Sequence, residues 1–130
     1  MATAPDALGA LGQVAVNVRD VPRATAFYRD VLGLRLLFEV PGMAFFEAGS
    51  VRLMLAVPTE ERFAHPASIL YYRVADIHAA HARLAGSGVA FLAPPHRVAR
   101  MPGHDLWMAF LDDSEGNTLA LMSEVAPAAG

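Results

Sequence analysis

Hydrophobic and polar positions alternate with a period of two from Gln13 to Val18. The valines of this segment fall on one face, and Gln13, Ala15 and Asn17 fall on the other. Such alternation is typical of a strand with one buried face. We therefore expect a strand that packs its valine face on a core and leaves its more polar face open.

The spacing then changes to that of a helix. Asp20 offers an N-cap oxygen, Pro22 suits the first turn, and Gly33 ends the pattern. Between them the apolar positions recur at helical spacing, at Val21, Ala24, Tyr28, Val31 and Leu32. The pattern predicts a helix of about three turns. Short apolar segments follow at 34–40, 43–48 and 51–57, separated by the turn pairs Pro-Gly and Gly-Ser, and these predict three strands.

The same order begins again after a charged linker bounded by prolines. A strand is predicted at 69–74, a helix at 77–85, and strands at 89–93, 106–111 and 118–123. One constant offset places Val18 on Val74 and Asp20 on Asp76, which indicates a duplicated module. We expect a single domain over residues 1–130, with module one at about 11–57, a linker at 58–67, module two at about 68–124, and short tails.

The duplication also predicts the architecture. Each module has a sheet with a helix on its apolar face, so the other face stays exposed unless a second module lies beside it. Two copies then form a continuous curved sheet with the helices outside and a central cup inside. The predicted fold class is α+β, with two βαβββ modules in a curved mixed sheet.

Composition removes several classes of function. The chain contains no cysteine, and its 10 basic residues are all arginine. This excludes disulfides, cysteine-ligated zinc, thiolate nucleophiles and Schiff-base chemistry. A net charge of -3, with the arginines spread along the chain, provides no basic stripe for nucleic acid. No apolar run is long enough for a membrane span and no signal peptide is evident, so we expect a cytoplasmic protein without membrane partners.

Two motifs indicate a family. Residues 26–34, which read AFYRDVLGL, close the first helix, and residues 113–117, which read DSEGN, precede the last strand. With the repeated strand order, they resemble the vicinal oxygen chelate superfamily, which includes glyoxalase I, extradiol dioxygenases, methylmalonyl-CoA epimerase, and fosfomycin and bleomycin resistance proteins. The resemblance covers residues 11–124 and implies the fold, but not the reaction, because the superfamily contains isomerases, lyases, oxygenases, transferases and simple binders.

Metal-dependent members of that superfamily hold a divalent ion with side chains from the first and last strands of each module. Carried over by position, these ligands fall on Gln13, Met54, Ile69 and Ala120. Only the first is an oxygen or nitrogen donor, and divalent ions of this kind require such donors. We therefore expect no metal and no other cofactor. A metal site would have to recruit His65 or His104 beside Gln13.

A small organic ligand is then the expected partner, because the open side of the sheet mixes apolar groups with a few polar ones. Arg52 and Arg73 stand out there. An unpaired buried guanidinium is costly, so each either pairs with a carboxylate such as Glu47 or waits for an anionic ligand. The methionines either fill the cup or contact the ligand. The substrate-binding candidates are Gln13, Asn17, Glu47, Arg52, Met54, Tyr71, Arg73, His96, Arg100, Trp107 and Met122.

The connection from 94 to 107 is longer than a usual hairpin loop and is predicted to be a lid or binding loop. Trp107 either stacks on a planar ligand or packs in the core. His96 and Arg100 either attract an acidic substrate or are solvated charges at the rim. His104 is the candidate for proton transfer, oriented by Asp105 or Glu47, or else it bonds to the loop backbone.

Three functions remain open. The first is an isomerase or lyase that works by proton transfer in a metal-free cup, with His104 as acid or base and Arg52 or Gln13 polarising the substrate. The second is a non-catalytic protein that sequesters an antibiotic or similar ligand. The third is a divalent-metal lyase or dioxygenase with atypical ligands. The resemblance also implies a homodimer, because relatives often complete their cups with modules from two chains.

Overall fold

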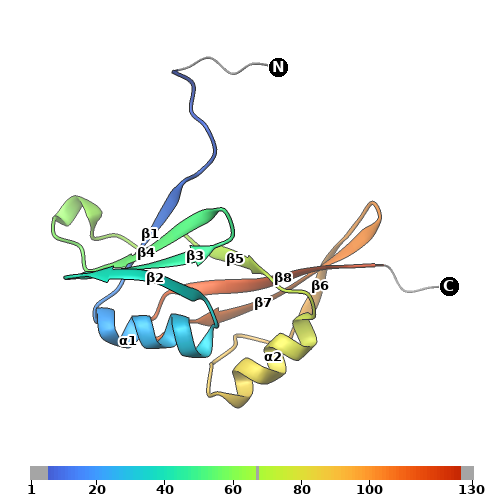
Figure 1. Cartoon of the computed structure of the whole chain (residues 1–130). Coiled ribbons are helices and arrows are strands. Elements are labelled where there is room, and N and C mark those ends of the chain that lie inside the picture. Colours follow the sequence, from blue (N-terminus) through green and yellow to red (C-terminus); the bar gives the residue numbers. More distant parts are fainter. Residues whose placement is uncertain (1–5, 67, 127–130) are drawn as a thin grey trace.

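Two four-stranded mixed sheets form the body of the molecule, and both helices lie on the same side of them (Figure 1). The structure is a computed structural model that describes residues 6–66 and 68–126. Most of each predicted tail, and residue 67 of the predicted linker, lie outside the described residues.

Sheet A contains β1 (Gln13–Asn17), β2 (Arg35–Val40), β3 (Met43–Ala48) and β4 (Val51–Ala56), in the order β1-β4-β3-β2. The strands β1 and β4 are parallel, and the other neighbours are antiparallel. The valine face of β1 points toward the helix side, as its alternation predicts. The buried core on that side includes Val16, Tyr28, Phe46, Leu53 and Leu55.

Sheet B repeats this arrangement with β5 (Leu70–Arg73), β6 (His96–Met101), β7 (His104–Asp112) and β8 (Thr118–Val125), in the order β5-β8-β7-β6. Its inner face packs on α2 (Ile77–Gly86), and its core includes Ile77, Leu84, Leu111, Leu119 and Leu121. The predicted α+β class with two βαβββ units is confirmed.

The first helix begins where the sequence predicts but changes type along its length. The Asp20 side chain caps α1 (Val21–Ala26) by accepting a hydrogen bond of 2.9 Å from the backbone N–H of Arg23. The helix then continues as a π-helical turn, η1 (Phe27–Val31), in which the N–H of Leu32 bonds to the carbonyl of Phe27. Apolar spacing alone does not distinguish the two helix types. Val31 and Leu32 pack against the sheet B core and so connect the two halves.

Two predictions for the second half are wrong. Residues 89–93 do not form a strand, and only an isolated bridge joins Phe91 to Leu111. The predicted long loop at 94–107 is instead a hairpin of β6 and β7, closed by Pro102 and Gly103. Gly103 has a φ of 84°, which glycine adopts without strain. The same Pro-Gly pair closes the hairpin of β2 and β3. The polar strand HRVARM carries little hydrophobic alternation, which explains why the pattern missed it.

No helix in the described part of the chain is long and apolar enough to cross a membrane.

Candidate functional site

The open face of sheet A, on the side away from the helices, carries three rows of side chains that the strand register brings together. The row at one end is polar and consists of Gln13, Arg52, Glu47 and Arg35. The middle row consists of Ala15, Met54, Phe45 and Phe38. The third row consists of Asn17, Ala56, Met43 and Val40. An apolar floor therefore borders a polar edge, and neighbouring rows are about 7 Å apart because every second residue of a strand shares a face.

The polar row is held by two separate interactions. The Nε of Arg52 donates to Oε1 of Gln13 at 2.7 Å, and its guanidinium carbon lies 5.4 Å from the centre of the Phe45 ring. Glu47 accepts from Nη1 of Arg35 at 3.2 Å. Glu47 is thus paired with Arg35 rather than with Arg52. Within the residues that the structure describes, Arg52 forms no ion pair with a carboxylate.

Aromatic and thioether groups form the floor. The rings of Phe38 and Phe45 are stacked with their centres 4.4 Å apart. The Nε2 of Gln13 lies 3.6 Å from Sδ of Met54, so the polar row contacts the floor directly. Methionine side chains adapt to ligands of different shapes because they are flexible and polarisable.

A connecting segment covers part of this face. We call residues 58–66 the strap; it includes the short helical turn η2 (Glu61–Phe63) and links β4 to β5 (Figure 1). Between the strap and sheet A lies a pocket of about 360 Å³, the strap pocket. Its volume is in the range of small-molecule sites. It is lined by Ala15, Asn17, Met43, Met54, Ala56, Val57, Pro58, Thr59, Phe63 and His65.

A larger hollow of about 590 Å³, the seam pocket, lies where the β3–β4 turn approaches β5. It brings together Glu47, Tyr71 and Arg73, three of the predicted site residues. Tyr72 also lines it, and burial together with the nearby negative charge of Asp113 raises the pKa of the Tyr72 hydroxyl to about 12. This phenol therefore stays protonated at neutral pH.

The open face of sheet B carries the predicted proton-transfer residue. Nε2 of His104 lies 3.7 Å from Oε2 of Glu124, and the other oxygen of Glu124 accepts from Arg73 at 3.1 Å. The expectation that Asp105 or Glu47 orients His104 is therefore wrong. Asp105 follows His104 along β7 and points to the opposite face, as alternation requires, where it lies 3.9 Å from Arg97.

Met122 and His96 lie in one row with Met108 on this open face. Nδ1 of His96 is 3.4 Å from the carbonyl oxygen of Pro94. Trp107 and Arg100 lie on the opposite, helix-facing side of sheet B, in register with Ser123 and Asp105.

Trp107 packs on the core and meets His78 of α2 edge-on, with 5.1 Å between ring centres. Of the two alternatives for Trp107, the structure shows core packing. The predicted site residues are therefore divided among three surfaces within one chain.

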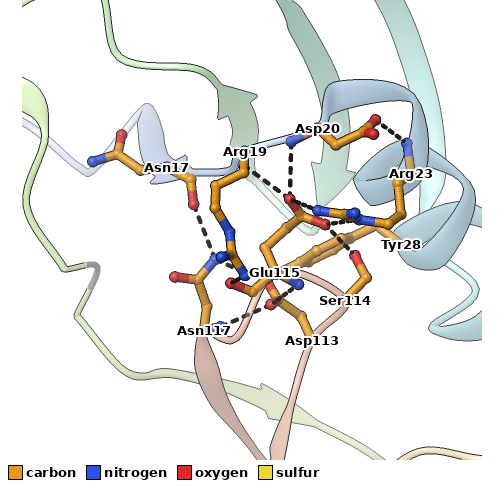
Figure 2. A network of polar contacts seen from close by, with 9 residues as sticks. All are labelled: Asn17, Arg19, Asp20, Arg23, Tyr28, Asp113, Ser114, Glu115 and Asn117. Atoms are coloured by element: carbon orange, nitrogen blue, oxygen red, sulfur yellow. Dashed lines mark hydrogen bonds and ion pairs between the residues drawn. The ribbon is translucent and has the colours of Figure 1, made fainter.

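Sequence reasoning missed a buried polar network that ties the DSEGN turn to the first helix (Figure 2). The side chain of Glu115 is fully buried. One of its oxygens accepts hydrogen bonds of 2.9 Å from the backbone N–H groups of Arg19 and Asp20, and the other accepts from Nε of Arg23 at 2.7 Å. The hydrogen bond from Arg23, helped by these backbone donors, lowers the pKa of Glu115 to about 2 although burial opposes it.

Asp113 anchors the other half of this network. It accepts from the hydroxyl of Tyr28 at 2.7 Å and from the backbone N–H groups of Glu115 and Asn117 at 2.8 Å. Burial, followed by the charge of Asp113, raises the pKa of Tyr28. The side-chain amide of Asn117 then donates to the carbonyl oxygen of Asn17 at 3.0 Å. The network therefore fixes the end of β1 from which Asn17 reaches the strap pocket.

The side chains at the metal-ligand positions of metal-dependent relatives do not fit a divalent ion. Gln13 already bonds to Arg52, Met54 offers a thioether, and the other two positions, Ile69 and Ala120, are hydrocarbons. Among residues 6–66 and 68–126, no three His, Asp or Glu side chains come together in a group that could hold a metal.

Comparison with known proteins agrees with the fold. The model of the Glyoxalase/Bleomycin resistance protein/Dioxygenase superfamily matches residues 10–121. TnmS3, an antibiotic binding protein from Streptomyces sp. CB03234, is similar with 26% identity and a TM-score of 0.72, over 91% of this chain and 98% of that one. A lactoylglutathione lyase from Agrobacterium tumefaciens is similar with 24% identity and a TM-score of 0.71, over 90% and 95% of the two chains. No curated protein sequence gives a significant match. The chain belongs to the glyoxalase/bleomycin resistance protein/dioxygenase superfamily.

Proposed function

We propose that this protein binds a planar organic anion in the strap pocket and along the adjoining open face of sheet A, and that it does so without turnover. The observation that carries this proposal is Arg52. Its guanidinium lies on the open face one row from Met54, which lines the strap pocket; it is oriented by Gln13 and Phe45 and pairs with no described carboxylate. Arginine stays charged at any working pH, so the group is suited to hold an anion and cannot act as a base.

The floor of the site suits the rest of such a ligand. Met43 and Met54 line the pocket, and the stacked pair of Phe38 and Phe45 continues the apolar surface toward Arg52. A planar ring placed on this floor gains contact with thioether and aromatic groups, and its acidic substituent reaches the guanidinium. The amide of Gln13 keeps the guanidinium in place before the ligand arrives, which reduces the ordering cost of binding.

The charges explain why the strap pocket is favoured over the larger seam pocket. Both charged groups of the seam pocket are already neutralised by neighbours, Glu47 by Arg35 and Arg73 by Glu124. An ionic ligand there would have to displace an existing partner. At Arg52 it would meet a guanidinium that no described carboxylate neutralises.

Binding without turnover is favoured by the chemistry of the lining. The titratable side chain of the strap pocket is His65, whose Nδ1 lies 3.1 Å from the carbonyl oxygen of Pro66. His104 lies on sheet B and lines neither of the two pockets described above. The similarity to TnmS3, an antibiotic binding protein, supports the same function.

Binding of 8-anilinonaphthalene-1-sulfonate, a planar aromatic anion, tests the proposal by fluorescence titration. We expect Arg52→Gln to weaken the affinity about tenfold, the effect of losing one charge-assisted contact. Binding to the unaltered protein should also weaken with added salt, and that dependence should fall in the variant. Arg35→Gln is the matched control, because Arg35 lies in the same row but is paired with Glu47. Equal losses in both variants, or none in either, would reject Arg52 as the anion site.

The contact between His104 and Glu124 favours a second function, proton transfer in an isomerase or lyase. Glu124 stands where it could orient the imidazole, as carboxylates do beside catalytic histidines. Mass spectrometry of a candidate ligand after incubation with the protein separates the two functions. Conversion by the unaltered protein that disappears in His104→Ala supports the enzyme, and recovery of unchanged ligand supports the binder.

We also propose that two chains pair and complete each other's open faces. Exposed apolar side chains on both open faces support this, including Phe38, Val40 and Tyr71. Sedimentation equilibrium measures the mass directly. Sedimentation as a monomer of 13.9 kDa would reject the dimer.

A further inference from the structure

We infer that Asn17 is a latch: its side-chain amide holds the strap over the strap pocket and so sets how fast a ligand enters and leaves. This inference rests on the proposed function and adds a positioning residue to the same site. Asn17 was predicted from the sequence as a ligand contact; it lines the strap pocket, and its hydrogen bonds give it an additional role.

The latch consists of two hydrogen bonds from one amide group. Nδ2 of Asn17 donates to the backbone carbonyl oxygens of Phe63 and of His65, the latter at 2.9 Å. Phe63 and His65 also line the pocket, so the bonds fix the two strap residues that cover it. Among the described residues, no other side chain of sheet A forms a hydrogen bond to the strap.

The strap has little else to hold it in place. All of its residues from Thr59 to Pro66 are exposed, and even the large apolar residue Phe63 remains 49% exposed. Its internal backbone–backbone hydrogen bonds are two short-range ones, from the N–H of Phe63 to the carbonyl of Glu60 and from the N–H of Ala64 to the carbonyl of Glu61. A segment with so little apolar burial opens at low cost, unless an anchor from the rigid part of the molecule holds it.

Asn17 is such an anchor because its own backbone is fixed from behind. Its carbonyl oxygen accepts from the side chain of Asn117, which is bonded in turn to buried Asp113. Figure 2 shows the Asn17 side chain directed away from this network, with only its carbonyl turned toward Asn117. The backbone of Asn17 is therefore fixed independently of the strap that its side chain holds.

Asn17→Asp removes the N–H donors with almost no change in shape. The new carboxylate faces two carbonyl oxygens, so it repels the strap instead of holding it. We expect the open form to become more populated. Asn17→Ser, which is too short to reach both carbonyls, serves as a second variant if the first disturbs folding.

Limited digestion with trypsin tests the latch without any ligand, because Arg62 lies within the strap. We expect cleavage after Arg62 to be about tenfold faster in Asn17→Asp, as follows from the loss of two hydrogen bonds. Cleavage after Arg35 in β2 should stay slow in both proteins and reports on global unfolding. Glu60→Gln removes only the surface ion pair between Glu60 and Arg62 and should leave the cleavage rate unchanged. Equal cleavage after Arg62 in Asn17→Asp and in the unaltered protein overturns the latch.

Stopped-flow mixing with 8-anilinonaphthalene-1-sulfonate then connects the latch to the site. Asn17→Ser, which adds no charge beside the anionic dye, should raise both the association and the dissociation rate by at least threefold, because opening is needed in both directions. A residue that merely contacts the ligand would change the dissociation rate alone. Faster cleavage together with unchanged dye kinetics would keep the latch but reject the strap pocket as the binding site.

Discussion

Replacing Glu115 by glutamine should remove a part of the protein's stability that depends on pH. In the folded protein the pKa of Glu115 is about 2, against an ordinary value of 4.5, and the main cause is the hydrogen bond from Arg23. A carboxylate whose pKa is lowered on folding contributes stability that is fully present above its unfolded pKa. That stability is lost as the pH falls from about 4.5 toward 2.

The magnitude follows from the size of this shift. The lowering of the pKa of Glu115 from 4.5 to about 2 corresponds to about 3 kcal/mol of unfolding free energy at neutral pH. The side chain of Arg23 is 51% exposed, so water screens part of the interaction. We therefore expect about 2 kcal/mol. At pH 3 less than half of this contribution should remain, since most of the titration window has been crossed.

Urea unfolding of both proteins at pH 7 and pH 3 is the assay. Glutamine keeps the shape of Glu115 but cannot accept from all of the donors around it, so Glu115→Gln should be less stable by about 2 kcal/mol at pH 7 and by less than half of that at pH 3. Asp30→Asn is the matched control, because Asp30 pairs with Arg29 on the surface and should show almost no gap at either pH. A gap of the same size at both pH values would refute the argument.

Three further predictions concern stability and spectroscopy. Tyr28→Phe removes the hydroxyl bonded to Asp113 and should cost about 1–3 kcal/mol of unfolding free energy in urea, because a buried acceptor is left with one partner fewer; a loss below 0.5 kcal/mol would contradict this. Gly103→Ala places a Cβ at a φ of 84° and should lower the thermal midpoint, whereas Gly86→Ala, at a helical glycine, should not. Trp107 is the only tryptophan and packs toward α2, so its emission should stay constant when a non-fluorescent ligand fills the strap pocket; a shift on binding would place the ligand elsewhere.

Patterns of buried residues predicted most of the fold. The alternation of Val14, Val16 and Val18 and the caps at Asp20 and Asp76 describe local structure, and local structure is what periodicity reports. The strand β6 was missed because it lacks such a pattern. It lies at an edge of sheet B, and three of its six residues are polar or charged while a fourth is alanine, so hydrophobic spacing carries no signal there. Only the Pro-Gly turn, repeated from sheet A, could have indicated it.

The site was less predictable because it depends on cross-strand register. The sequence places Arg52 on an open face and offers Glu47 as a possible partner, but it does not show that Arg35 takes this carboxylate. Contacts between residues that are far apart in the chain cannot be predicted from local sequence patterns. Nothing near Arg23 indicates that its partner is Glu115, 92 residues later.

The separation between these partners has a consequence for synthesis of the chain. The strands of sheet A and its helix are complete once residue 56 has been made, yet the backbone donors of Arg19 and Asp20 and the guanidinium of Arg23 lack their acceptor until Glu115 emerges. The helix α1 is therefore closed by a turn that is made 92 residues after Arg23. Contacts so distant along the chain slow folding, so folding of the first half is completed only after residue 115 has been made.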